Sequence, residues 1–272
     1  MGRASATALD PRIREMAVMG DLRVWSVIVT IFGDAVLPRG GLVPARAVTA
    51  LAARLGIRAE AVRVALHRLA RDGWIERTRA GRHAFYGLSA SGRARFLPAS
   101  RRIYAPAPAL SEPWRLAVLP AGGAGAAVLE RAGWLALNGG CWLGPAEAGA
   151  APREAVVAER LAAMPDWART ALAGAPLQAD YARLERALRR VSASLDTASL
   201  PEAEVAAALR ILIVHHWRRL LLRHPDVPAE LLPEGWRGEA CRAHVLKLHA
   251  ALSAVADAWL DEAIGPRVGR GS

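Results

Sequence analysis

A basic helical pattern that ends at a glycine constrains the fold of this 272-residue chain more than any other feature. Within residues 58–72, the apolar side chains Val62, Leu66 and Leu69 recur at the spacing that lines one face of a helix. Basic side chains occupy positions off this face. Gly73 follows the last turn, where helices commonly end in a left-handed residue. The sequence therefore predicts an amphipathic basic helix with a defined C-terminus.

Two short runs follow this helix, residues 74–78 and 83–89, and the charged turn 79–82 joins them. Two such runs around a turn that contains glycine predict a β-hairpin. Two further helical patterns precede the basic helix, the first over residues 22–38 and the second over residues 44–55. This order is typical of a winged helix-turn-helix, in which one helix enters the major groove of DNA and the hairpin contacts the backbone or minor groove.

Basic side chains are concentrated in and around this region. A solvated surface helix would explain one such helix alone, but the basic hairpin and the preceding helix pair favour DNA binding. Residues 1–104 carry 18 Arg and 7 acidic residues, whereas residues 105–272 carry 18 basic and 18 acidic residues. A DNA-binding region attached to a neutral body is expected to show this distribution. The candidate DNA contacts are Arg39, Arg58, Arg63, His67, Arg68, Arg71, Arg77, Arg79 and Arg82.

Long ungapped segments of the chain are similar to a known family. They are TIFGDAVLPRGG (Thr30–Gly41), VRVALHRLARDGWI (Val62–Ile75), GRHAFYGLSASGRARF (Gly81–Phe96), RRIY (Arg101–Tyr104) and LIVHHWRRLLLRHPDVPAELLPEGWRGEA (Leu212–Ala240). On these segments the chain resembles the PaaX family, which are repressors of phenylacetic acid degradation operons. The resemblance implies a central domain similar to the Cas2 fold. It also implies that a coenzyme A thioester, such as phenylacetyl-CoA, is the effector.

The patterns predict an α+β chain of four segments. We expect a flexible lead-in over residues 1–20, a winged helix DNA-binding domain over 21–104, a ferredoxin-like (Cas2-like) domain over 105–176, and a helical ligand-sensing and dimerisation domain over 177–272. Strand–helix–strand–strand–helix order suits a small ferredoxin-like domain. The expected central strands are 114–119, 134–137 and 141–143, and the expected central helices are 125–132 and 153–164.

A dense cluster of polar and aromatic residues lies in the last segment. Its arginines could meet the phosphates of a coenzyme A ester, and its tryptophans could stack on the rings. The alternative is structural, with arginines at a helix C-terminus and tryptophans in a core. The candidate effector-binding residues are His215, Trp217, Arg218, Arg219, Arg223 and Trp236.

The chain carries no nucleophile elbow, HExxH or P-loop motif, so we expect a transcriptional repressor and not an enzyme. We expect no cofactor and no metal site, because Cys241, His244 and His249 lack a regular ligand spacing. The expected partners are double-stranded operator DNA, an acyl-CoA effector and a second copy of the chain. The last helix, residues 239–264, is a candidate seam of the homodimer.

No apolar run reaches the length needed to span a membrane, and no targeting segment is apparent at the start of the chain. We therefore expect a cytoplasmic protein without a membrane partner. Two other functions are compatible with the sequence. One is a nucleic-acid-processing enzyme that uses the Cas2-like domain, and the other is a constitutive DNA-binding protein.

Overall fold

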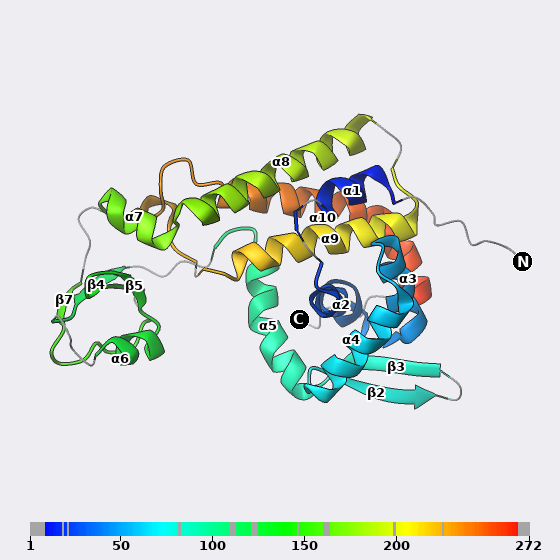
Figure 1. Cartoon of the computed structure of the whole chain (residues 1–272), viewed down its shortest axis with the longest axis horizontal. Coiled ribbons are helices and arrows are strands. Elements are labelled where there is room, and N and C mark those ends of the chain that lie inside the picture. Colours follow the sequence, from blue (N-terminus) through cyan, green and yellow to red (C-terminus); the bar gives the residue numbers. More distant parts are fainter. Residues whose placement is uncertain are drawn as a thin grey trace, which may run out of the picture. The chain divides into compact units, whose positions relative to one another are not determined.

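The structure, a computed structural model, contains two compact units (Figure 1). Unit 1 combines residues 1–106 with residues 181–222 and 238–272, and unit 2 consists of residues 107–180 and 223–237. The C-terminal helices therefore share a unit with the N-terminal region, although the sequence pattern placed them in a separate segment. The residues that the structure describes are 9–17, 19–20, 22–80, 83–108, 113–120, 125–145, 147–159, 164–197, 200–224 and 226–265.

Helix α9 (Ala203–Leu221) forms the centre of unit 1. Every side chain from residue 206 to residue 217 on this helix is buried. A helix that is buried all round must be enclosed by other elements, and α9 is enclosed from both halves of the chain. It packs against α1 (Pro11–Ala17), α2 (Val24–Ile31), α3 (Ala45–Arg54), α5 (Ala90–Tyr104) and α10 (Gly238–Ala263) (Figure 1).

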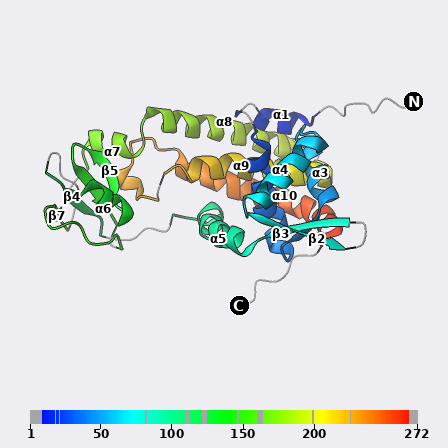
Figure 2. The same cartoon turned by 60° about the horizontal axis from the view of Figure 1, so that its bottom comes forward.

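The N-terminal elements of unit 1 follow the order of a winged helix. After α2 come β1 (Leu42–Pro44), α3, α4 (Ala59–Arg71), and the hairpin of β2 (Ile75–Ala80) and β3 (His83–Leu88). The three strands form an antiparallel sheet in the order β1-β3-β2. Figure 2 shows its β2-β3 hairpin. Gly73 has a φ of 72° between α4 and β2, as expected for the residue that ends the helix. The predicted second and third helices and the hairpin are confirmed, and β1 is an additional strand.

The first helix of the winged helix continues irregularly after Ile31. Residues Phe32–Val36 form a π-helical turn and Leu37–Arg39 a 3-10 turn, where the sequence predicted a continuous helix to residue 38. A Cβ on Gly33 would lie 1.7 Å from the ring of Phe96 in α5. Because the ring occupies the space of a side chain, α5 can approach this turn only at a glycine.

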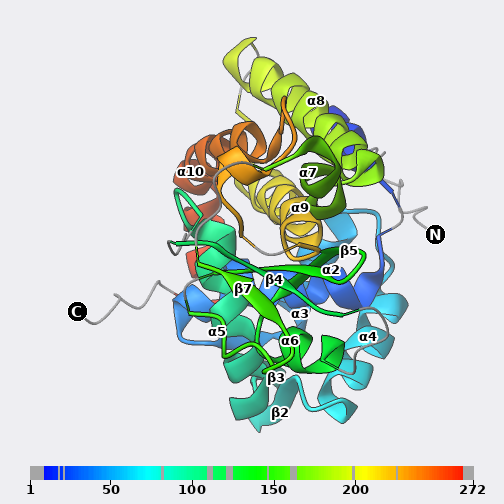
Figure 3. The same cartoon turned by 90° about the vertical axis from the view of Figure 1, so that its left-hand side faces the viewer.

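Unit 2 is built on a four-stranded antiparallel sheet in the order β5-β6-β4-β7. Figure 3 labels β4, β5 and β7 of this sheet. Its strands are β4 (Arg115–Val118), β5 (Leu135–Asn138), β6 (Cys141–Gly144) and β7 (Val156–Ala158). Helix α6 (Ala126–Arg131) connects β4 with β5, and Gly139 and Gly140 form the turn of the β5-β6 hairpin with positive φ. The strand–helix–strand–strand part of this order agrees with the expected ferredoxin-like arrangement.

The helix predicted over residues 153–164 is wrong in its described part. Residues 153–155 form a turn, and Val156–Ala158 pair with β4 as the edge strand β7. Alanines and charges gave this stretch a helical pattern, but the β-branched Val156 and Val157 complete the sheet instead. Residues 160–163 lie outside the described residues.

Three further elements complete the fold. Helix α7 (Asp166–Leu172) and the 3-10 turn Ala229–Leu231 belong to unit 2, where Trp114, Leu143 and Val227 contribute to one apolar core. Helix α8 (Ala175–Thr197) begins in unit 2 and continues in unit 1. None of the helices in the described part of the chain is long and apolar enough to cross a membrane.

Candidate nucleic-acid interface

Helix α4 has one buried face and one basic exposed face. Its inner face is apolar and is formed by Val62, Ala65, Leu66 and Leu69. These side chains pack against the rest of unit 1, so the remaining positions of the helix point to solvent. The candidate residues of this region that are exposed as predicted are Arg58, Arg63, His67, Arg68 and Arg71.

The arginines of α4 have weak partners on the same helix or at its C-cap. Arg63 Nη2 lies 3.2 Å from Glu60 Oε1, and both side chains are more than three-quarters exposed. Arg68 and Arg71 lie 3.5 and 3.4 Å from the two carboxylate oxygens of Asp72. Exposed ion pairs of this kind contribute about 0–1 kcal/mol, so each guanidinium can exchange its carboxylate for a phosphate or a base edge at low cost.

The β2-β3 hairpin adds a second group of exposed cations. Arg77 and Arg79 are exposed on β2, and strand alternation places them on the same face as the buried Ile75. Ile75 anchors the base of the hairpin in the core, and the part of β2 beyond it carries the positive charges of Arg77 and Arg79. Arg82 in the turn lies outside the described residues.

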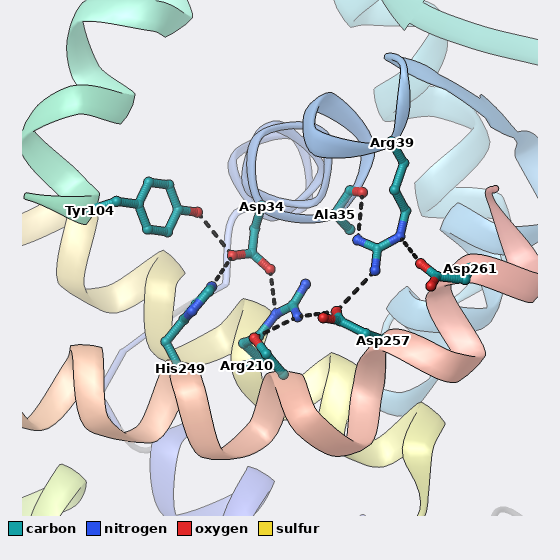
Figure 4. Close-up of polar contacts among 9 residues, drawn as sticks. Asp34, Ala35, Arg39, Tyr104, Arg210, His249, Asp257 and Asp261 are labelled. Atoms are coloured by element: carbon teal, nitrogen blue, oxygen red, sulfur yellow. Dashed lines mark hydrogen bonds and ion pairs between the residues drawn. The ribbon is translucent and has the colours of Figure 1, made fainter. Parts of the chain in front are cut away.

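Arg39 does not belong to this surface, which corrects the prediction that it contacts DNA. Its side chain is fully buried, with Nε 2.8 Å from Asp261 Oδ1 and Nη2 2.9 Å from Asp257 Oδ1 (Figure 4). Its Nη1 donates to the carbonyl of Ala35 at 3.2 Å. Arg39 lies within the winged helix in sequence, but the acidic side chains of α10 hold its guanidinium inside unit 1.

A buried ionic cluster surrounds Asp34 in the π-helical turn (Figure 4). Arg210 Nε donates to Asp34 Oδ2 at 2.8 Å, and neither side chain is exposed. Tyr104 donates its hydroxyl to Asp34 Oδ1 at 2.9 Å, and His249 Nε2 lies 2.9 Å from the same oxygen. Arg210 Nη1 also donates to Asp257 Oδ1 at 3.0 Å. We call Asp34, Tyr104, Arg210, His249 and Asp257 the Asp34 cluster.

Electrostatics keep Asp34 ionised and Tyr104 protonated within this cluster. Burial alone would raise the pKa of Asp34, but the charge of Arg210 and the hydrogen bond from His249 outweigh it and hold that pKa well below its usual value. Burial and the negative charge of Asp34 raise the pKa of Tyr104 far above its usual value, so the phenol stays a donor. Asp34 is therefore ionised at neutral pH and accepts three hydrogen bonds.

No pattern in the sequence predicted the Asp34 cluster. Its members come from the π-helical turn, α5, α9 and α10, so no local spacing brings them together. One signal was present: Arg210 interrupts an otherwise apolar helical run from residue 205 to residue 214. A charge inside such a run requires a buried partner. The cluster ties the winged helix to the C-terminal helices, although the two lie far apart in sequence.

The candidate effector residues His215 and Arg218 form a second polar group inside unit 1. Arg218 Nε donates to Thr30 Oγ1, and its Nη2 donates to the carbonyl and hydroxyl oxygens of Ser26, each at 2.7 Å. Thr30 Oγ1 lies 3.2 Å from His215 Nδ1. Burial and the charge of Arg218 lower the pKa of His215 to about 2. Burial lowers the pKa of Arg218 to about 10, so it remains charged at neutral pH.

The other candidate effector residues are distributed over both units. Trp217 is buried in unit 1 and donates from Nε1 to the carbonyl of Ile103 at 3.0 Å. Arg219 is exposed on the same helix. Arg223 and Trp236 belong to unit 2, where Arg223 Nη1 lies 2.7 Å from Asp180 Oδ2 and Trp236 packs edge-to-face on His224. His215, Trp217 and Arg218 therefore have structural partners inside the protein.

The strand order, the helix pair and the exposed cations define a winged-helix protein whose core is completed by its own C-terminal helices. Residues 23–92 match the family model described as PaaX-like protein, and residues 173–262 match that of the PaaX-like protein C-terminal domain. The chain therefore belongs to the PaaX-like family. It is 29% identical over 265 residues to the transcriptional repressor PaaX of Escherichia coli strain K12, a match that covers 87% of this chain and 83% of that protein.

Proposed function

We propose that this protein is a transcriptional repressor that binds duplex DNA through α4 and the β2-β3 hairpin. The observation that carries the proposal is the exposed set of cations on these two elements of a winged helix. The similarity to a protein named as a transcriptional repressor supports the same function. In this proposal the protein is a regulator and not an enzyme.

The two cationic elements have different roles in this proposal. The side chains of α4 reach base edges in the major groove, because a recognition helix enters that groove with its outward face. Arg77 and Arg79 of the hairpin contact phosphates, which fix the position of the protein without reading the sequence. Specific recognition therefore depends on α4, and the hairpin contributes affinity for any duplex.

We also propose that the protein binds its operator as a symmetric homodimer. One winged helix contacts few base pairs, and a two-fold pair doubles the number of specific contacts on a palindromic site. The C-terminal helix is not available as the apolar seam expected from the sequence. Its apolar side chains Val245, Leu248, Leu252 and Leu260 are buried within the protein's own fold. The proposed interface must therefore use another surface.

The first prediction separates base contacts from phosphate contacts. Arg63→Ala is expected to lower affinity for the preferred operator by about 1–3 kcal/mol and to leave affinity for unrelated duplex almost unchanged. Arg79→Ala is expected to weaken binding to the operator and to unrelated duplex alike. It is also expected to reduce the slope of log affinity against log salt concentration by about 1. Fluorescence anisotropy on an operator enriched from a random duplex pool measures both effects.

Arg186→Ala provides the matched control for this experiment. Arg186 is an exposed arginine on α8, so its loss removes the same charge from a different element. We expect its operator affinity to equal that of the wild-type protein. Full operator affinity in Arg63→Ala would contradict the assignment of α4 as the recognition helix.

We propose further that an aryl-acetyl coenzyme A thioester, such as phenylacetyl-CoA, releases the repressor from DNA. The support is the family resemblance, which implies a thioester effector. An effector acts only through its difference in affinity for the DNA-competent and DNA-incompetent states. To shift the protein from mostly bound to mostly free, it must prefer the incompetent state by roughly 10⁴-fold.

The second prediction follows from the reciprocity of such coupling. The thioester is expected to bind more weakly when operator is present, by the same factor by which it weakens operator binding. Calorimetric titrations with phenylacetyl-CoA, phenylacetate and coenzyme A, each with and without operator, measure this factor. Equal thioester affinity in both conditions would contradict the switch and favour a constitutive DNA-binding protein. Tight binding of free phenylacetate would identify the acid as the effector.

A further inference from the structure

The outward face of α4 carries one apolar side chain that the fold does not use. Val64 is 63% exposed, the largest exposed fraction among the large hydrophobic residues described in unit 1. Successive helix residues point about 100° apart, so Val64 projects almost opposite to the buried Val62 and Leu66. It therefore lies at the middle of the face that is directed away from the protein.

Nothing in helix formation favours valine at this position. Valine has lower helix propensity than alanine, arginine or glutamate, and an exposed side chain gains little from packing. The exposed positions around it are polar, with Glu60, Arg63, His67 and Arg68 on the same helix. The apolar surface of a valine on an exposed, charged helix face is removed from water only when a binding partner covers it.

The stereochemistry of valine suits a contact of defined geometry. A β-branched side chain on a helix is restricted to one dominant χ1 rotamer, so both methyl groups have fixed positions. In the major groove, thymine alone among the four bases presents a methyl group, at C5. Contact between apolar side chains and this methyl is one of the recurrent base contacts. The basic side chains around Val64 can contact phosphates and the edges of purine bases next to that thymine.

We infer that Val64 is a specificity-determining residue that contacts the C5-methyl group of a thymine in each operator half-site. This inference rests on the proposed function, because it assigns one base contact to the recognition helix. The Val64 contact differs from the charged contacts because its strength does not depend on salt and because it recognises a single methyl group. The binding partner of this helix face is therefore duplex DNA, with a thymine opposite Val64.

Uracil substitution in the operator tests the inference directly. Deoxyuridine pairs with adenine and keeps the O4 acceptor of thymine but lacks the C5-methyl. For the wild-type protein, replacing one thymine in each half-site is expected to weaken binding about three- to fivefold, the effect of one lost methyl contact. Val64→Ala is expected to bind the unmodified operator more weakly by a similar factor and to show no further loss at that same position.

Two comparisons make the outcome specific. Leu97→Ala removes another exposed apolar side chain, on α5, and is expected to keep the wild-type response to every uracil substitution. Affinity for unrelated duplex is expected to be the same in Val64→Ala and the wild-type protein. If Val64→Ala and the wild-type protein respond equally to uracil at every thymine, the inference is overturned while the proposed function stands. A wild-type protein that enriches no duplex sequence would overturn both.

Discussion

Replacement of Arg210 by methionine is expected to lower the free energy of unfolding of unit 1 by about 3–5 kcal/mol. The variant leaves the carboxylate of Asp34 fully buried without the guanidinium that donates to it at 2.8 Å. It also removes a donor to Asp257. A buried charge that has lost its partner keeps its desolvation cost and loses the attraction that offset it. Urea unfolding followed by far-ultraviolet circular dichroism measures the change.

Two variants show whether the effect comes from the buried pair. Arg63→Met removes an arginine whose ion pair with Glu60 is exposed, and it is expected to leave the unfolding transition almost unchanged. The double replacement Asp34→Leu with Arg210→Met removes both charges and is expected to lose less stability than the sum of the two single replacements. A small loss in Arg210→Met, comparable with that in Arg63→Met, would contradict the importance of the Asp34 cluster.

Acidification from pH 7 to pH 5 is expected to destabilise unit 1 by about 2 kcal/mol for each of two buried histidines. Burial lowers the pKa of His215 to about 2, with the charge of Arg218 acting in the same direction. Burial and the charge of Arg219 lower the pKa of His216 to about 4. In the unfolded chain both imidazoles return to their ordinary pKa near 6.5 and take up protons below it.

The direction of this effect follows from the lowered pKa values. The native state favours the neutral imidazoles, so their contribution to stability is complete above about pH 6.5 and is lost as the pH falls. The geometry supports neutral side chains, because Nε2 of His215 and of His216 is buried without a hydrogen-bond partner in the described part of the chain. A protonated ring would need an acceptor at both nitrogens. Asp34, whose pKa is lowered in the folded state, adds a further loss only at lower pH, because the ordinary pKa of an aspartate in the unfolded chain, about 3.9, lies below that of histidine.

Thermal unfolding at a series of pH values between 7 and 5 measures this linkage. The variant His67→Gln is the matched control, because His67 is exposed on α4 and its loss is expected to keep the wild-type slope. The variant His216→Asn is expected to have a shallower slope. A wild-type stability that stays constant from pH 7 to pH 5 would contradict the buried, neutral state of these histidines.

Local patterns were sufficient to predict most of the winged helix. The apolar spacing of Val62, Leu66 and Leu69, the glycine at the end of α4, and the charged turn between two apolar runs each act over a few residues. The same spacing predicted that Arg63, His67 and Arg68 are exposed, because residues off an apolar helical face point to solvent. The short strand β1 has no such pattern, since its pairing with β3 depends on a segment about 40 residues later in the chain.

The chain's own sequence determined which face of α4 is apolar, where the helix ends and where the net positive charge lies. Tertiary structure alone decided that α9, from the C-terminal half, completes the core of the winged helix. It placed Arg39 beside Asp257 and Asp261 instead of on the DNA-facing surface. It also turned residues 156–158 into an edge strand. The physical reason is that buried charges and unpaired strand edges take their partners from distant segments, and those partners leave no local periodicity in the sequence.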